Sequence, residues 1–496
     1  MKKKIRLLNL QVDLFNGDFM SAYKKLLNNS FVFAIGNVGS KAIAFILVPI
    51  YTFYLTSAEY GTIDLAVTTA NLVIPLISLC IYEAVLRFIM DVNSNIKEIY
   101  TNGIILTFLS SIAALAIFLV AYLLFTEKNF SNSLVIIVYL LVISQMFQKL
   151  HSQFAKALDK NKLYAFNGIL LTLLIGILNI IFVVFLDYGI MGYLCSLIIS
   201  YWLSTLFIVI MTKSYLYFDI NLHNWILQKK LLLYSIPLIP NSIMWWATDS
   251  LSRYLIGFYL SVSANGYYAV ASRLPSLITV FSDVFYQAWQ LSAIDEYEKD
   301  NKDFYTDIFT IYYTFLFLVA SFIMIILKPI FRNFIAQEYY PSWSIVPFLL
   351  LSVIFASLSS FMGAFYVASK NTGGVLKTSI LGGIFATILS FVLIPTIGLE
   401  GAGIASMVSY ILMFISRFLE VKRKIKIAMN MKIFTVNISI IAVQIFVLFL
   451  NLNVTSEIFI QILLIVCNLI ANKNILIKIS ILISNFIIAK NKQKGE

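Results

Sequence analysis

Fourteen long apolar stretches run through the chain, and each is long enough to cross a lipid bilayer as a helix. A helix needs about 20 mainly apolar residues to cover roughly 30 Å of hydrocarbon. The expected spans lie at residues 31–56, 62–89, 101–125, 133–150, 164–186, 189–212, 231–260, 266–294, 304–328, 343–367, 375–397, 400–419, 433–451 and 455–472. Every connection between them is short. The sequence therefore predicts an all-α polytopic membrane protein with about 14 transmembrane helices.

Basic residues are distributed unevenly between the two sets of connections. Thirty of the 36 Lys and Arg residues fall on the N-terminal segment, every second connection and the C-terminal tail, with Arg417 counted in the connection after span twelve. The other set holds only Lys128, Lys328 and Arg332. Cytoplasmic loops carry the excess of Lys and Arg, so both termini are expected in the cytoplasm. The net charge of +12 thus reflects topology, and we expect no nucleic-acid partner.

Two internal matches indicate that the first twelve spans form a repeat. A shift of 205 residues aligns span one with span seven, and a shift of 209 aligns spans five and six with spans eleven and twelve. The matched residues are Phe53-Tyr54-Leu55 with Phe258-Tyr259-Leu260, Gly61 with Gly266, Gly189 with Gly398, and Gly192 with Gly401. Six spans separate the copies, so both enter the membrane from the same side, as in transporters built from parallel repeats. We expect two pseudo-symmetric six-helix lobes around a central cavity, plus two C-terminal helices.

This arrangement divides the chain into five parts. They are a cytoplasmic N-terminal segment (1–30), an N-lobe of spans one to six (31–212), a C-lobe of spans seven to twelve (231–419), two further spans (433–472) and a basic cytoplasmic tail (473–496).

Charged residues inside the expected spans are the candidates for a functional site. Three basic residues belong to no connection, and three acids accompany them. They are Lys41, Arg253 and Arg273, and Asp64, Asp249 and Asp283. A charge at the bilayer centre costs at least about 2.5–3.5 kcal/mol, so such groups face a protein interior or a watery cavity. We interpret all six as substrate-binding candidates, with Lys41 near the midplane and the two arginines toward the outer leaflet.

Cations along the expected cavity favour an anionic substrate, because arginine offers phosphate a bidentate fork as well as charge. Two alternatives stay open. Asp249 and Arg253 are four residues apart on one helix and would neutralise each other in a structural pair. In the second alternative, Asp64 is a proton or sodium site instead of a substrate contact.

Enzyme chemistry is not expected. His151 and His223 lie in connections without a nucleophile or metal partners, and no phosphate-cradling glycine loop with its lysine is present. The three cysteines have no paired spacing, so neither a zinc site nor a disulfide framework is indicated. We expect no metal and no cofactor.

The segment Asn37 to Lys41, followed by Pro49 to Gly61, resembles the opening helix and first outer loop of bacterial polysaccharide flippases. These belong to the multidrug/oligosaccharidyl-lipid/polysaccharide exporter superfamily. The Gly189 to Gly192 and Gly398 to Gly401 turns extend the resemblance over most of the chain. It implies a multi-pass protein of the bacterial inner membrane that moves undecaprenyl-diphosphate-linked oligosaccharide to the outer leaflet, for capsule, O-antigen or exopolysaccharide assembly.

Carried over by position, the resemblance assigns contact with the diphosphate to Lys41, Arg253 and Arg273. Membrane lipid, and a polysaccharide polymerase with its assembly proteins, are the partners it implies. The main alternative is an ion-coupled drug/cation antiporter of the same superfamily, for which an acid-rich cavity would be typical. A major-facilitator sugar transporter fits the first outer loop less well, and a polymerase would need a large outer loop or catalytic acids.

Overall fold

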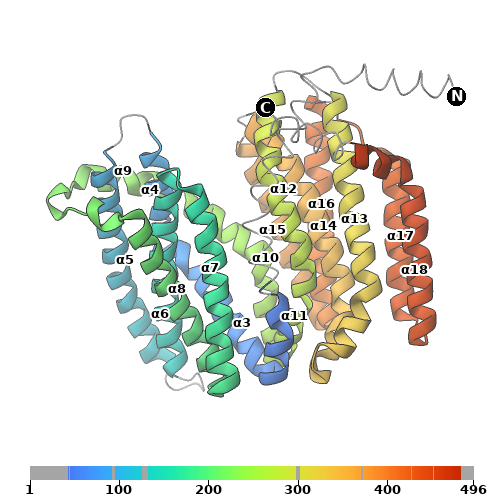
Figure 1. Ribbon diagram of the computed structural model, residues 1–496, viewed down its shortest axis with the longest axis horizontal. Helices are drawn as coiled ribbons and strands as arrows, with labels where there is room; N and C mark the ends of the chain where they lie inside the picture. The colour runs from blue at the N-terminus through green and yellow to red at the C-terminus, as the bar shows by residue number, and fades with distance from the viewer. Residues whose placement is uncertain are drawn as a thin grey trace, which may run out of the picture.

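The computed structural model describes residues 43, 45–91, 95–125, 132–297, 302–369, 372–425, 427–450 and 452–481, and the regular elements within them are all helices. Lys41 lies outside the described residues. Figure 1 shows two helical bundles side by side, with α3, α10 and α11 between them and α17 and α18 at the far edge of the second bundle. The expected all-α, two-lobe architecture with two extra C-terminal helices is confirmed.

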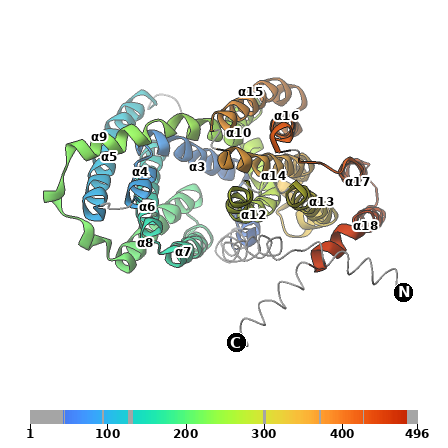
Figure 2. The same cartoon turned by 90° about the horizontal axis from the view of Figure 1, so that it is seen from above.

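The N-lobe and the linker come first in the chain. The N-lobe contains a short helix Phe45–Tyr54, α3 (Ser57–Ile77), α4 (Ile81–Ile89), α5 (Ile96–Phe125), α6 (Asn132–Ala157), α7 (Asn161–Asn179) continued by the π-helical turn η1 (Ile180–Phe185), and α8 (Gly189–Thr212). The linker contains η2 (Ser214–Tyr217), η3 (Ile220–Leu222) and α9 (Trp225–Ser235). Seen from above in Figure 2, α9 runs across one end of the N-lobe.

The C-lobe and the two final helices follow. The C-lobe contains α10 (Leu238–Tyr259), α11 (Val262–Ala271), α12 (Arg273–Tyr297), α13 (Lys302–Asn333), η4 (Gln337–Ile345), α14 (Val346–Ala368), α15 (Thr372–Ile397) and α16 (Leu399–Ile425). Helices α17 (Met431–Phe449) and α18 (Val454–Ala471) pack against α13, where Lys328 pairs with Glu457 at 2.6 Å. Below, "gate end" means the end where α3 begins at Ser57 and α11 at Val262, and "linker end" the opposite one, where α9 lies.

Eleven helices in the described part of the chain are long and apolar enough to span a membrane. Three expected spans are not among them. Span 31–56 is described only in part, span 231–260 corresponds to the end of α9 with α10, and span 266–294 corresponds to α11 with α12. The last two carry Arg253 and Arg273, and their polar composition fits helices that face the other lobe more than lipid.

Helix boundaries differ from the expected spans where local chemistry intervenes. Helix α3 begins at Ser57, five residues earlier than expected, because Thr56 and Glu59 form a capping box that starts it. The expected outer loop at Glu59 to Gly61 is therefore the first turn of α3. The expected span 231–260 is split between α9 and α10, because Pro237 has no N–H to continue α9.

The internal repeat is visible where the two lobes cross. A Cβ on Gly61 would lie 2.0 Å from the carbonyl oxygen of Val262, and a Cβ on Gly266 would lie 2.1 Å from that of Ser57. Each glycine thus lies against the backbone carbonyl group of the residue four positions before the glycine that it matches in the repeat. Helices α3 and α11 pack backbone to backbone around a pseudo-twofold axis, and only glycine leaves room for that approach.

The second match, shifted by 209 residues, marks two equivalent helical hairpins. Gly189 begins α8 with φ +49°, and Gly398 lies between α15 and α16 with φ +81°. This left-handed conformation favours glycine, because an L side chain is strained there. The repeat inferred from glycine spacing therefore corresponds to equivalent turns in the two lobes.

Candidate functional site: charged groups between the lobes

An ion pair joins the two lobes near the gate end. Arg253 on α10 donates to Asp64 on α3 at 2.5 Å, with the two side chains 21% and 11% exposed. Asn265 on α11 donates to the other oxygen of Asp64 at 3.2 Å and to the carbonyl of Gly61 at 3.1 Å. The carboxylate of one lobe is therefore held by two donors from the other.

Arg273 lies beside this pair without a carboxylate of its own. It donates to the hydroxyl of Tyr60 at 2.7 Å, and its guanidinium lies 5.8 Å from the centre of the Tyr60 ring. Within the described ranges no Asp or Glu forms an ion pair with Arg273. The Nε atoms of Arg253 and Arg273 are both buried without a hydrogen-bond partner in that part of the chain. The cluster therefore keeps donors to spare for an anion.

Aromatic side chains enclose these groups at the gate end. The Tyr60 ring stacks on Tyr51 at 6.1 Å and meets Tyr339 edge-on at 6.4 Å. Tyr339, on η4, donates to the carbonyl of Leu55 at 2.9 Å, and the neighbouring Glu338 accepts from the N–H of Ser57 at 3.0 Å. Contacts between the lobes thus continue from the charged cluster to the surface of the gate end, which is closed in this structure.

The two other predicted acids lie apart from the ion pair. Asp249 is on an exposed position of α10 and accepts a short hydrogen bond from the Tyr410 hydroxyl on α16. Arg253 forms its ion pair across the lobes with Asp64, and the described residues show no ion pair between Arg253 and Asp249. Asp283 lies ten residues beyond Arg273, about 15 Å further along α12 toward the linker end. The structure thus brings together Asp64, Arg253 and Arg273.

Sequence reasoning missed one buried cation. Arg417 was expected in a connection, but it lies within α16 and is only 2% exposed. It donates to the hydroxyls of Thr378 and Ser379 on α15 and to the carbonyl of Ser359 on α14, each at 2.9 Å. Its position five residues before the basic run that starts at Lys422 hid it. The signal that could have found it is the helical register of α16, which places Arg417 on the same face as Tyr410 and Met413.

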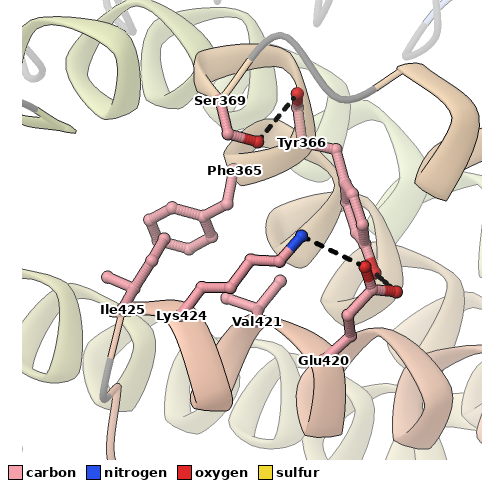
Figure 3. Close-up of a pocket in the computed structure, with 7 residues that line it drawn as sticks. All are labelled: Phe365, Tyr366, Ser369, Glu420, Val421, Lys424 and Ile425. Atoms are coloured by element: carbon pink, nitrogen blue, oxygen red, sulfur yellow. Dashed lines mark hydrogen bonds and ion pairs between the residues drawn. The ribbon is translucent and has the colours of Figure 1, made fainter.

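A small, shallow pocket lies at the linker end between α14 and α16 (Figure 3). Glu420 fills its polar side, accepting from Tyr366 at 2.8 Å and from Lys424 at 3.3 Å. The charges there satisfy each other within one lobe, so this pocket is not part of the cluster between the lobes. No group of three or more His, Cys, Asp or Glu placed to hold a metal ion occurs among the residues the structure describes.

A match to a protein-family model identifies the family of the chain. The family model described as "Polysaccharide biosynthesis protein" matches residues 26–290, more than half of the chain. The chain belongs to this family. Among curated proteins, the search found no match.

Solved structures agree with this family at the level of the fold. The lipid II flippase MurJ, in an inward closed conformation, matches with a TM-score of 0.65 at 15% identity, over 90% of this chain and 100% of that one. A MOP superfamily transporter from Pyrococcus furiosus, described as having a binding pocket of reverse polarity, matches with a TM-score of 0.59 at 14% identity, over 82% of this chain and 97% of that one. An inward-facing multidrug resistance MATE transporter matches with a TM-score of 0.57 at 17% identity, over 81% of this chain and 95% of that one.

The family model confirms the predicted polysaccharide family, and the solved structures agree with the fold expected for a multi-pass protein of the predicted superfamily. At this identity they establish the fold alone. The proteins they name are transporters and a flippase.

Proposed function

We propose that this protein is a flippase that moves a saccharide linked to a lipid by an anionic diphosphate, such as undecaprenyl-diphosphate-linked oligosaccharide, from the inner to the outer leaflet for cell-surface polysaccharide assembly. The observation that carries the proposal is the cluster of two arginines and one carboxylate between the lobes. A diphosphate carries the charge and the paired oxygens that arginine forks bind. The family match and the MurJ-like fold support the same class of cargo.

The proposed transport cycle follows from where the partners of each arginine lie. Asp64 holds Arg253 across the lobe boundary while the gate end is closed. An arriving diphosphate competes with Asp64 for Arg253 and takes the spare donors of Arg273. Loss of the cross-lobe pair then favours separation of α3 from α10 and α11, so the gate end opens and the linker end closes.

The proposed orientation places the linker end in the cytoplasm of a bacterial inner membrane, with both termini on that side. The excess of basic residues on one set of connections supports it. We also retain the five-part division of the chain, with lobes at 31–212 and 231–419, two further spans at 433–472, and cytoplasmic segments at 1–30 and 473–496. In the same scheme Lys41 would meet the diphosphate on its way to the arginines.

The experiment that tests this function compares two arginine variants in the native host. Cells without the protein are expected to accumulate lipid-linked oligosaccharide in the inner leaflet, and the wild-type protein restores export. Arg273→Ala is expected to fail, as is Lys41→Ala. Arg332→Ala is the matched control, because Arg332 is exposed at the gate end of α13, a helix that carries none of the cluster residues. Equal export by Arg273→Ala and Arg332→Ala would reject the assignment.

A second function, ion-coupled export of cationic drugs, is favoured by one observation: the exposed Asp249, held by Tyr410, is a carboxylate that a cation would bind. Asp283 would be a further acid on the same path. Ethidium efflux separates the two functions. A flippase of the proposed kind leaves ethidium accumulation unchanged when expressed, whereas an antiporter lowers it and loses that effect with Asp249→Asn.

A further inference from the structure

The linker between the lobes carries a stripe of apolar side chains that the protein does not cover. In α9, Trp225, Ile226 and Leu233 are 67%, 68% and 66% exposed. Lys229 and Lys230 are exposed on the same helix face, one on each side of Leu233 by helical angle. The preceding 3-10 turns add further exposed residues of the same kind. They are Tyr215, Leu216, Phe218 and Ile220.

The opposite face of α9 is fixed to the N-lobe. Leu231 and Ser235 are fully buried, and Gln228 is 1% exposed. The buried face belongs to a core with the linker ends of α4, α5 and α6. The helix therefore presents a permanent outer face, and its exposed residues are not waiting to fold onto the chain's own core.

Hydrogen bonds to α5 set the depth of the linker relative to the membrane. Thr101 binds the carbonyl of Tyr217 at 3.2 Å, and Asn102 binds the carbonyl of Leu222 at 2.9 Å. The N–H of Asn224, the N-cap of α9, donates to Asn102 at 2.9 Å. The mainly apolar part of α5, which carries no charged residue, begins just after Asn102. The linker is thus held within about one helical turn of the hydrocarbon boundary, at the level of the lipid headgroups.

We propose that the stripe is an interfacial anchor that binds the cytoplasmic leaflet, with its apolar residues among the upper acyl chains and Lys213, Lys229 and Lys230 on anionic headgroups. An apolar centre flanked by lysines is the pattern of helices that lie in the membrane interface. The linker segment carries three lysines against one acid, Asp219, so its charge complements an anionic surface. Because α9 leads through Pro237 into α10, the anchor fixes the start of the helix that carries Arg253 to the leaflet.

The anchor is tested by spin-label depth measurements on the full chain in vesicles. Cys80, Cys195 and Cys467 are replaced by serine or alanine, and single labels are placed by Ile226→Cys and Leu233→Cys. Phe446→Cys, exposed on the apolar helix α17, is the lipid-facing control, and Arg423→Cys, at the linker end of α16, is the water-facing one. In vesicles with phosphatidylglycerol, labels at 226 and 233 are expected to be more accessible to oxygen than to a soluble nickel complex, as at 446.

A second arm tests the headgroup contact. Replacing the three lysines with glutamine is expected to make the depth of these labels independent of phosphatidylglycerol, whereas the unsubstituted linker lies deeper with it than in phosphatidylcholine alone. Labels at 226 and 233 with the nickel accessibility of the Arg423→Cys control would overturn the anchor and leave the stripe to a soluble protein partner. The inference rests on the proposed orientation, because that orientation places the linker on the cytoplasmic leaflet, whose surface is negatively charged. The depth readout needs no substrate, so failure of the flippase assignment and failure of the anchor are separate results.

Discussion

Two arginine sites in this protein differ in where their partners lie. Arg417 is bound by neutral oxygens of α14 and α15, all within the C-lobe. Arg253 is bound by a carboxylate of the opposite lobe, and its neighbour Arg273 is bound by Tyr60 of that lobe. When two lobes rock, contacts inside a lobe persist and contacts across the boundary must break. The comparison therefore separates a cation that holds one lobe together from cations that change partners during transport.

The largest expected effect is on stability and comes from the acceptors of Arg417. The double substitution Thr378→Val with Ser379→Ala removes two hydrogen bonds to a buried charge, each contributing about 1.5–3 kcal/mol. Thermal unfolding in detergent should shift down strongly. Adding Arg417→Met should restore much of the loss, because the charge that needed the acceptors is gone. No rescue by Arg417→Met would show that the hydroxyls do not act through Arg417.

The cross-lobe pair should instead control conformation. Asp64→Asn removes the counter-charge of Arg253 only where the lobes are closed, so it should favour the open gate end by about 1.5–3 kcal/mol. Spin labels at Ala58→Cys and Asn333→Cys, exposed on opposite lobes, should report a longer distance. The exchange of Asp64→Arg with Arg253→Asp should bring the short distance back.

Asp187→Asn is the matched control for this measurement. Asp187 is an exposed acid at the gate end of the N-lobe, and asparagine tolerates its positive φ of 51°. A distance change as large with Asp187→Asn as with Asp64→Asn would contradict a specific role for the cross-lobe pair.

The glycine crossing should give an effect of similar or smaller size. Gly61→Ala places a methyl group 2.0 Å from the Val262 oxygen, so the helices must separate to accept it. Overpacking of this kind costs about 1–3 kcal/mol, and it weakens only the closed gate end. The same spin-label pair measures it. Gly168→Ala is the control, because nothing lies within 4 Å of the added Cβ, and it should leave the distance unchanged. An unchanged distance with Gly61→Ala would refute the tight crossing.

The smallest effect is expected at the surface pair of Figure 3. Lys424→Ala removes an exposed i,i+4 ion pair with Glu420, for which about 0.3–0.5 kcal/mol is typical. Stability and export should both stay near wild type. A loss of export with Lys424→Ala would mean that charge within one lobe also serves transport.

Much of this architecture was readable from the sequence, because membrane helices need length and apolarity and repeats leave glycines at fixed spacing. Gly61 and Gly266, matched by a shift of 205 residues, pack against each other across the lobe boundary. Arg253, Arg273 and Asp64 were identified from the cost of charge in a span, and the structure brings them together.

The partners of these residues could not be predicted from the sequence. Spacing along one helix favours Asp249 as the partner of Arg253, and only the crossing of α3 with α10 brings Asp64 next to Arg253. Arg417 was misplaced for a related reason. A basic residue near the end of a span looks like part of a loop until helix packing shows which face it occupies. The start of α3 was missed because its capping box resembles a polar loop.

The account depends most on an anion binding the arginines between the lobes. Binding of undecaprenyl-diphosphate-linked saccharide to the purified protein, measured by native mass spectrometry, tests this directly. Wild-type protein and Arg332→Ala are expected to bind equally, while Arg273→Ala loses at least tenfold in affinity, which corresponds to about 1.4 kcal/mol for one charge-assisted contact. Undiminished binding by Arg273→Ala, or equal binding of the same saccharide on an uncharged lipid, would contradict it.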